Sequence, residues 1–163
     1  KGRKVETAWL DVKGQPIYIN LTGLKVRFPP SVYNGTGQET KKNVVFDLTT
    51  EQSKHMSELE RRIREAAAPV VGSATWNSWL REDSEPRLKV KVTENTAYYD
   101  AQCQRIDCPS DEEWRGMVCC AKVLVKAIWV HNRTAGLLGE VTDLQVLEKP
   151  RDQRECPFKS WPQ

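Results

Sequence analysis

The chain has 163 residues, which is enough for one domain with a hydrophobic core of its own. Its formal net charge of +3 is too small for a protein that binds nucleic acid by overall charge, so any such binding requires a local basic patch. The 39% hydrophobic content and the six tryptophans indicate a folded chain, and no apolar run is long enough to span a bilayer.

The first part of the chain predicts two strands. Apolar and polar residues alternate over residues 17–28, and Gly23 within this run indicates a bulge or bend. Residues 29–30 are both proline and are expected to end the strand. After a polar loop that contains glycine, alternation over residues 44–48 predicts a second, short strand.

Residues 50–68 predict the main helix. Thr49 is in position to cap this helix, and Gln52 completes a capping box. Pro69 and Gly72 are expected to end it. Apolar residues recur at helical spacing, at Met56, Leu59, Ile63 and Ala66. Three arginines lie off this apolar stripe and are expected to face solvent: Arg61, Arg62 and Arg64.

Residues 87–93 predict a strand with one basic face. Its apolar residues point one way, and Arg87, Lys89 and Lys91 point the other way. Cations in a row repel one another unless something negative lies opposite. Four aromatic residues lie near this strand in the sequence: Trp76, Trp79, Tyr98 and Tyr99. Basic residues interleaved with aromatic ones are typical of surfaces that stack bases and neutralise phosphates, and a solvated edge strand is the alternative interpretation.

Residues 118–130 predict one long strand that repeats this pattern. One face carries small apolar residues together with Trp129, and the other carries Lys122 and Lys126 among apolar residues. A strand face that carries both lysines and apolar residues can hold an extended polyanion. An ordinary amphipathic strand whose lysine side chains reach water shows the same pattern. A turn over residues 131–136 and a last strand over residues 137–147 complete the series.

Together these elements predict a mainly β fold, an OB-fold-like small barrel with one central α-helix (residues 50–68) and extra loops. Residues 94–117 predict a strand, a loop and a turn within this fold. A β-sandwich is the alternative architecture. We expect residues 1–149 to form a single OB-like nucleic-acid-binding domain, followed by a polar C-terminal tail over residues 150–163.

Motifs of catalysis and metal binding are absent from the sequence. There is no glycine-rich phosphate loop and no nucleophile motif, so we expect no enzyme and no cofactor. The five cysteines lack the spacing of a zinc site, and their odd number favours a reducing, intracellular setting in the nucleus or cytoplasm: Cys103, Cys108, Cys119, Cys120 and Cys156. Three sequons, at Asn20, Asn34 and Asn132, suit a secreted and glycosylated β-domain instead, and this alternative stays open.

Several segments in this order carry a resemblance to a known family. They are Ile17–Asn20, Lys25–Pro30, the helix 50–68, Ser78–Trp79, Arg87–Val92, Lys122–Trp129 and Gly139–Val146. The chain resembles the OB-fold single-stranded DNA-binding proteins of bacteriophages and large DNA viruses, of the replication and recombination accessory type. The resemblance spans most of residues 17–147 and depends on order and pattern.

The resemblance implies sequence-tolerant binding of single strands beside replication or recombination proteins, at a viral replication site if the source is viral. Phage members of this family carry an acidic C-terminal tail that competes with DNA. The stretch from Lys149 to Gln163 of this chain holds four basic residues instead, so regulation of that kind is not expected: Lys149, Arg151, Arg154 and Lys159.

The sequence therefore predicts a non-enzymatic, sequence-tolerant binder of single-stranded DNA that does not associate with membranes, and an RNA partner stays open. We expect phosphates to be held by Arg87, Lys89, Lys91, Lys122 and Lys126, and bases to stack on Trp79, Tyr98, Tyr99 and Trp129. Adjacent strand residues point to opposite faces, so only one of the two tyrosines should stack while the other supports the fold. The alternative is a β-rich protein-interaction or structural module.

Overall fold

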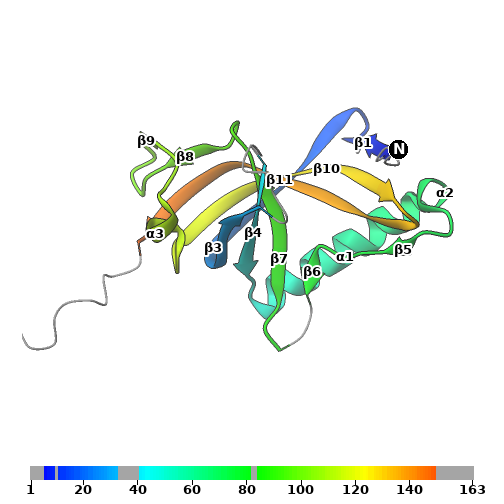
Figure 1. Ribbon diagram of the computed structural model, residues 1–163, viewed down its shortest axis with the longest axis horizontal. Coiled ribbons are helices and arrows are strands. Elements are labelled where there is room, and N and C mark those ends of the chain that lie inside the picture. Colours follow the sequence, from blue (N-terminus) through cyan, green and yellow to red (C-terminus); the bar gives the residue numbers. More distant parts are fainter. Residues whose placement is uncertain (1–5, 10, 33–40, 82–83, 150–163) are drawn as a thin grey trace, which may run out of the picture.

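The computed structural model describes residues 6–9, 11–32, 41–81 and 84–149 (Figure 1). Its centre is a barrel of five strands, paired in the order β3–β4–β7–β11–β10 and back to β3. These strands are β3 (Gln15–Ser31), β4 (Lys42–Asp47), β7 (Arg87–Val92), β10 (Val118–His131) and β11 (Thr134–Glu148). The predicted mainly β, OB-like barrel is confirmed, and the sandwich alternative is wrong because one sheet closes on itself.

The long strand β3 bends where the sequence predicts a bulge. Gly23 has a φ of 64° and lies where the register with β10 shifts between Cys119 and Ala121. The predicted end of the strand at residues 29–30 is wrong, since β3 continues to Ser31. Both prolines lie in a second irregular stretch of the pairing with β4, between Phe28 and Ser31, where a missing backbone donor is tolerated.

The main helix is α1 (Thr50–Ala66), and its predicted start is confirmed. The Thr49 side chain accepts a hydrogen bond from the Gln52 backbone, and the Gln52 side chain accepts one from the Thr49 backbone. Gln52 also donates to the Thr22 carbonyl oxygen at 2.9 Å, which ties the start of the helix to the bend of β3. Pro69 does not follow the helix directly, because it lies in a second short helix, α2 (Ala68–Val71).

The remaining elements are short. They are β1 (Glu6–Trp9), β2 (Asp11–Val12), β5 (Thr75–Trp76), β6 (Leu80–Arg81), β8 (Ala97–Tyr99), β9 (Arg105–Ile106) and α3 (Asp111–Trp114). Figure 1 shows β8, β9 and α3 together at one end of the barrel, while α2, β5 and the turn between β10 and β11 lie at the other end. Helix α3 was predicted only as a turn, although Ser110 and Glu113 form a capping box there.

The hydrophobic core fills the barrel and continues beneath α1. Met56 and Ile63 of α1 are buried against it, as the predicted apolar stripe requires. Trp114 is buried at the α3 end, where its ring and that of Tyr98 form a T-shaped pair at a centroid distance of 5.9 Å. Within the described part of the chain, no helix is both long and apolar enough to cross a membrane.

Candidate nucleic-acid interface

The outer face of β4 and β7 carries the predicted row of cations. Arg87, Lys89 and Lys91 alternate with buried residues and point away from the core. Opposite them on β4 lie Asp47, Val45 and Asn43, in that order. The alternation of β7 is thus as predicted, and Asp47 supplies a negative charge opposite Arg87.

A cavity of about 580 Å³ lies beside this row, and we call it the tryptophan cavity. It is lined by Lys89 and Lys91 of β7 together with Trp79 and Trp129. Asn43, Asn77, Ser78, Val90, His131, Leu137, Leu138 and Gly139 complete its wall. Four of the nine predicted site residues are therefore brought together, as two cations and two indole rings.

Two glycines of β11 allow both indole rings to pack closely on the sheet. A Cβ atom at Gly139 would lie 2.6 Å from Cζ3 of Trp79, and one at Gly136 would lie 2.9 Å from Cζ2 of Trp129. Real Cβ atoms essentially never approach other heavy atoms so closely. The absence of side chains at these two positions therefore fixes where the rings lie.

Helix α1 holds the segment that presents Trp79. The Glu60 carboxylate accepts hydrogen bonds from the Ser78 hydroxyl at 2.6 Å and from the Trp79 backbone N–H at 3.3 Å. The Ser78 hydroxyl oxygen in turn accepts a bond from the Leu80 N–H at 3.0 Å. These bonds join α1 to the start of β6, so Trp79 is a wall of the cavity and is only 5% exposed. Sequence reasoning missed Glu60, because nothing local links it to residue 79.

Trp129 reaches the cavity because the strand that carries it is irregular. The register between β10 and β11 shifts between Val125 and Ala127, so the strict alternation used for the prediction fails there. Ala127 and Ile128 are both buried, and Ile128 lines a separate groove against α1. Trp129, the next residue, consequently lines the tryptophan cavity.

The lysines of β10 lie apart from the tryptophan cavity. Strand β11 separates β10 from β7, and its Glu140 lies opposite Lys91 of β7 in the register. Glu140 pairs with Lys126 at 3.1 Å, and Asp143 lies opposite Lys122 in the register. Lys122 also lies over the Tyr18 ring, with 4.5 Å from Nζ to the centroid. The structure thus brings Lys89 and Lys91 together but does not bring Lys122 and Lys126 to the same cavity.

The two predicted tyrosines differ in exposure. Tyr98 is 5% exposed and packs on Trp114, and burial and a hydrogen bond with Cys108 raise the pKa of its hydroxyl. Tyr99 is half-buried, with Arg105 over its ring at 5.7 Å. Tyr98 is therefore placed to support the fold, and Tyr99 is the one of the pair whose ring is partly accessible.

The arginines of α1 add little to this face. Arg61 bonds both Glu58 and Glu65, and Arg62 bonds Glu58. Hydrogen bonds from these two arginines hold the pKa of Glu58 at about 2. This charge network is solvent-exposed and internal to the helix, as expected from the sequence. Among the described residues, no group of histidine, cysteine and acidic side chains could hold a metal ion.

Comparison with known proteins gives matches of structure only. The chain matches no family model and no curated protein. The single-stranded DNA-binding protein of bacteriophage Enc34, solved in complex with ssDNA, superposes with a TM-score of 0.59 and 9% identity over 82% of this chain and 86% of that chain. The single-stranded DNA-binding protein gp2.5, encoded by bacteriophage T7, superposes with a TM-score of 0.60 and 14% identity. The match covers 90% of this chain and 97% of that chain. The likeness confirms the fold that the order of elements predicted.

Proposed function

We propose that this protein is a sequence-tolerant single-stranded DNA-binding protein that acts in DNA replication or recombination. The observation that carries the proposal is the tryptophan cavity, whose wall combines two lysines with two tryptophans. Phosphates need the cations and bases need the flat rings, and neither contact depends on base identity. A protein-interaction or structural module would not need the two kinds of group in one cavity.

The shared fold supports this proposal. The bacteriophage Enc34 and T7 proteins that superpose on the chain are both single-stranded DNA-binding proteins, and one of them was solved with ssDNA bound. The four described cysteines are free, which suits the proposed intracellular setting. We infer that the protein binds without catalysis and works beside replication or recombination proteins. Titration with oligouridine in parallel with oligo-dT tests whether it prefers DNA to RNA.

Tryptophan fluorescence during titration with oligo-dT tests the proposal. Bases that stack on Trp129 should quench emission, and affinity should fall steeply as salt rises because bound strands release counterions. The variant Trp129→Phe should lose part of the quenching while keeping an aromatic ring in the cavity. Lys54→Ala, an exposed change on α1, serves as the control and should bind as the unmodified chain does. A folded sample without quenching or a mobility shift at low salt would contradict the proposal.

A further inference from the structure

Phe28 is an exposed aromatic residue between two guanidinium groups. Its side chain on β3 is 50% exposed, although Phe is usually buried. The guanidinium carbon of Arg27 lies 6.0 Å from the ring centroid, and that of Arg87 lies 5.9 Å from it. The ring and the two cations thus form a compact group on the outer surface of the barrel.

Glu85 binds both of these arginines through one oxygen atom. Glu85 Oε2 lies 2.7 Å from Nη2 of Arg27 and 3.1 Å from Nη2 of Arg87. Guanidinium groups bind phosphate oxygens through the same charge-assisted hydrogen bonds that they make with a carboxylate. Glu85 is 54% exposed, so its carboxylate can move into water without a large desolvation change.

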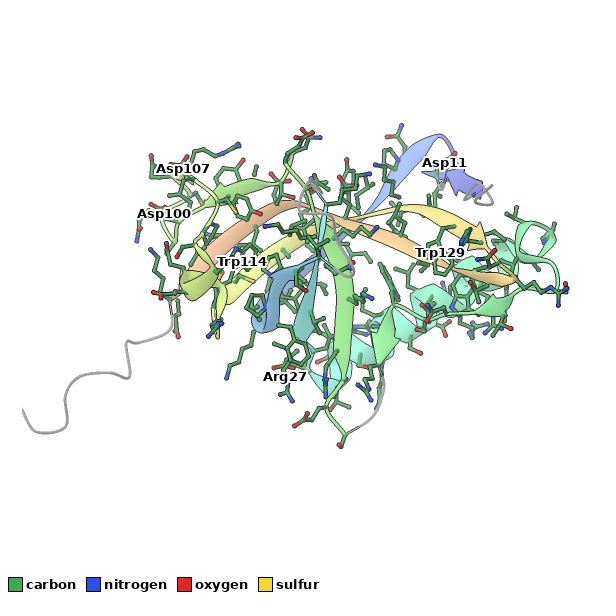
Figure 2. All side chains as sticks on the ribbon, in the orientation of Figure 1. Asp11, Arg27, Asp100, Asp107, Trp114 and Trp129 are labelled. Atoms are coloured by element: carbon green, nitrogen blue, oxygen red, sulfur yellow. The ribbon has the colours of Figure 1, made fainter. Side chains whose placement is uncertain are left out.

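This group is continuous with the tryptophan cavity. A second cavity of about 220 Å³ is lined by Phe28, Val45 and Arg87, and it shares Ser78, Trp79 and Lys89 with the first. Figure 2 shows Arg27 and Trp129 in separate regions of the molecule. The two cavities therefore follow one another along the outer face of β4 and β7, with Trp79 between them.

We propose that Phe28, Arg27 and Arg87 form a second nucleotide subsite, in which a base stacks on Phe28 and a backbone phosphate replaces the Glu85 carboxylate between the arginines. This inference rests on the proposed binding of single strands and extends the same groove. Glu85 is then an internal competitor that holds both arginines in place while no strand is bound. A strand must be long enough to pass Trp79 before it reaches this subsite.

Glu85→Gln tests the competitor. Removing the carboxylate should tighten binding of a long oligo-dT by about two- to fivefold, the range of an exposed ion pair. It should also steepen the dependence of log affinity on log salt, because no displaced carboxylate then takes up a cation when the phosphate binds. Glu58→Gln is the matched control, because it makes the same change of charge on α1, where Glu58 binds Arg61 and Arg62. Equal effects of the two changes would overturn the competitor role.

Phe28→Ala tests the stacking platform. The variant should weaken binding of a long oligo-dT by about 5- to 150-fold, the range for loss of one stacked base, with little change in salt slope. A strand too short to extend beyond the tryptophan cavity should bind Phe28→Ala and the unmodified chain alike. Phe28→Leu keeps apolar bulk and should behave as the alanine variant does, because it lacks the ring.

The outcomes separate the subsite from the proposed function. If long strands bind the unmodified chain and are quenched at Trp129, but Phe28→Ala binds them equally well, the subsite is wrong and the proposed function stands. If no strand binds the unmodified chain, the proposed function fails and the subsite fails with it. A loss for Phe28→Ala that is equal for short and long strands would also overturn the subsite, because it would indicate a change in the tryptophan cavity.

Discussion

At the scale of single residues, the contact between Trp79 and Gly139 determines the shape of the tryptophan cavity. Trp79 comes from the segment before β6, and Gly139 lies on β11, so the contact joins two distant parts of the chain. A ring that packs directly on backbone has no room to shift toward the sheet. The position of this wall therefore depends on a residue that has no side chain.

Gly139→Ala should displace the Trp79 ring. The added Cβ atom would lie 2.6 Å from Trp79 Cζ3 and 3.0 Å from Val90 Cγ1. We expect a loss of about 1–3 kcal/mol in the free energy of unfolding, as for other overpacked sites, together with weaker binding of oligo-dT. Denaturant unfolding and fluorescence titration measure the two effects.

A double-mutant cycle with Trp79→Leu provides the control for this change. The smaller leucine side chain leaves space for the alanine at position 139. The losses of stability in the two single variants should therefore add to more than the loss in the double variant. Strict additivity would contradict the contact. Trp79 is buried and its ring lies directly against Gly139, so the two changes should be coupled if the contact exists.

Sequence reasoning could place Lys89 and Lys91 on one outer face of the barrel because their signal is local. The alternation of β7 places both lysines on one face, and the structure keeps that alternation. The position of Trp129 was not predictable in the same way, since a bulge reverses its side of the strand. The ion pair between Lys126 and Glu140 joins two neighbouring strands. The residues around Lys126 do not show which acidic residue the next strand will bring close to it.

At the scale of elements, α1 acts as a support for the site rather than as a part of it. Its apolar stripe packs on the core, while Glu60 reaches the segment that carries Ser78 and Trp79. The start of the helix was predictable because a capping box is a local signal. Its role as a support was not predictable, since residues 60 and 78 meet only when α1 lies beside β6.

Glu60→Ala should loosen the segment before β6. The change leaves the Ser78 hydroxyl and the Trp79 N–H without their acceptor, so we expect a loss of about 1–3 kcal/mol in the free energy of unfolding. Binding of oligo-dT should weaken as well, because Trp79 is no longer held as a wall of the cavity. Glu60→Gln keeps an acceptor oxygen and should recover part of both losses.

Glu65→Ala is the matched control for Glu60, since it removes a carboxylate from the same helix without touching Ser78 or Trp79. The Glu65 carboxylate pairs with Arg61 at 2.6 Å on the exposed side of the helix. Affinity for oligo-dT should stay unchanged in this variant. Equal loss of affinity for the two alanine variants would mean that α1 contributes through its charge, and the supporting role of Glu60 would then be wrong.

At the scale of the whole molecule, positive charge is concentrated locally while the net charge stays at +3. The outer face of β7 carries three cations in a row, and the neighbouring strand β11 carries Glu140 and Asp143. This arrangement divides the four predicted lysines into two sets. Lys89 and Lys91 line the tryptophan cavity, whereas Lys126 is ion-paired and Lys122 covers Tyr18.

Salt dependence of binding can distinguish these two sets of lysines. Lys89→Ala should weaken binding of oligo-dT and flatten the slope of log affinity against log salt by about 0.7, because one phosphate contact is lost. Lys126→Ala should change the slope much less, because the Glu140 carboxylate already neutralises this ammonium group at 3.1 Å. Titrations at four or more salt concentrations give the slopes, and Lys54→Ala on α1 is the charge-matched control. Equal flattening by Lys89→Ala and Lys126→Ala would show that one strand contacts both β7 and β10. The groove would then cross β11, and Glu140 would have to release Lys126 when DNA binds.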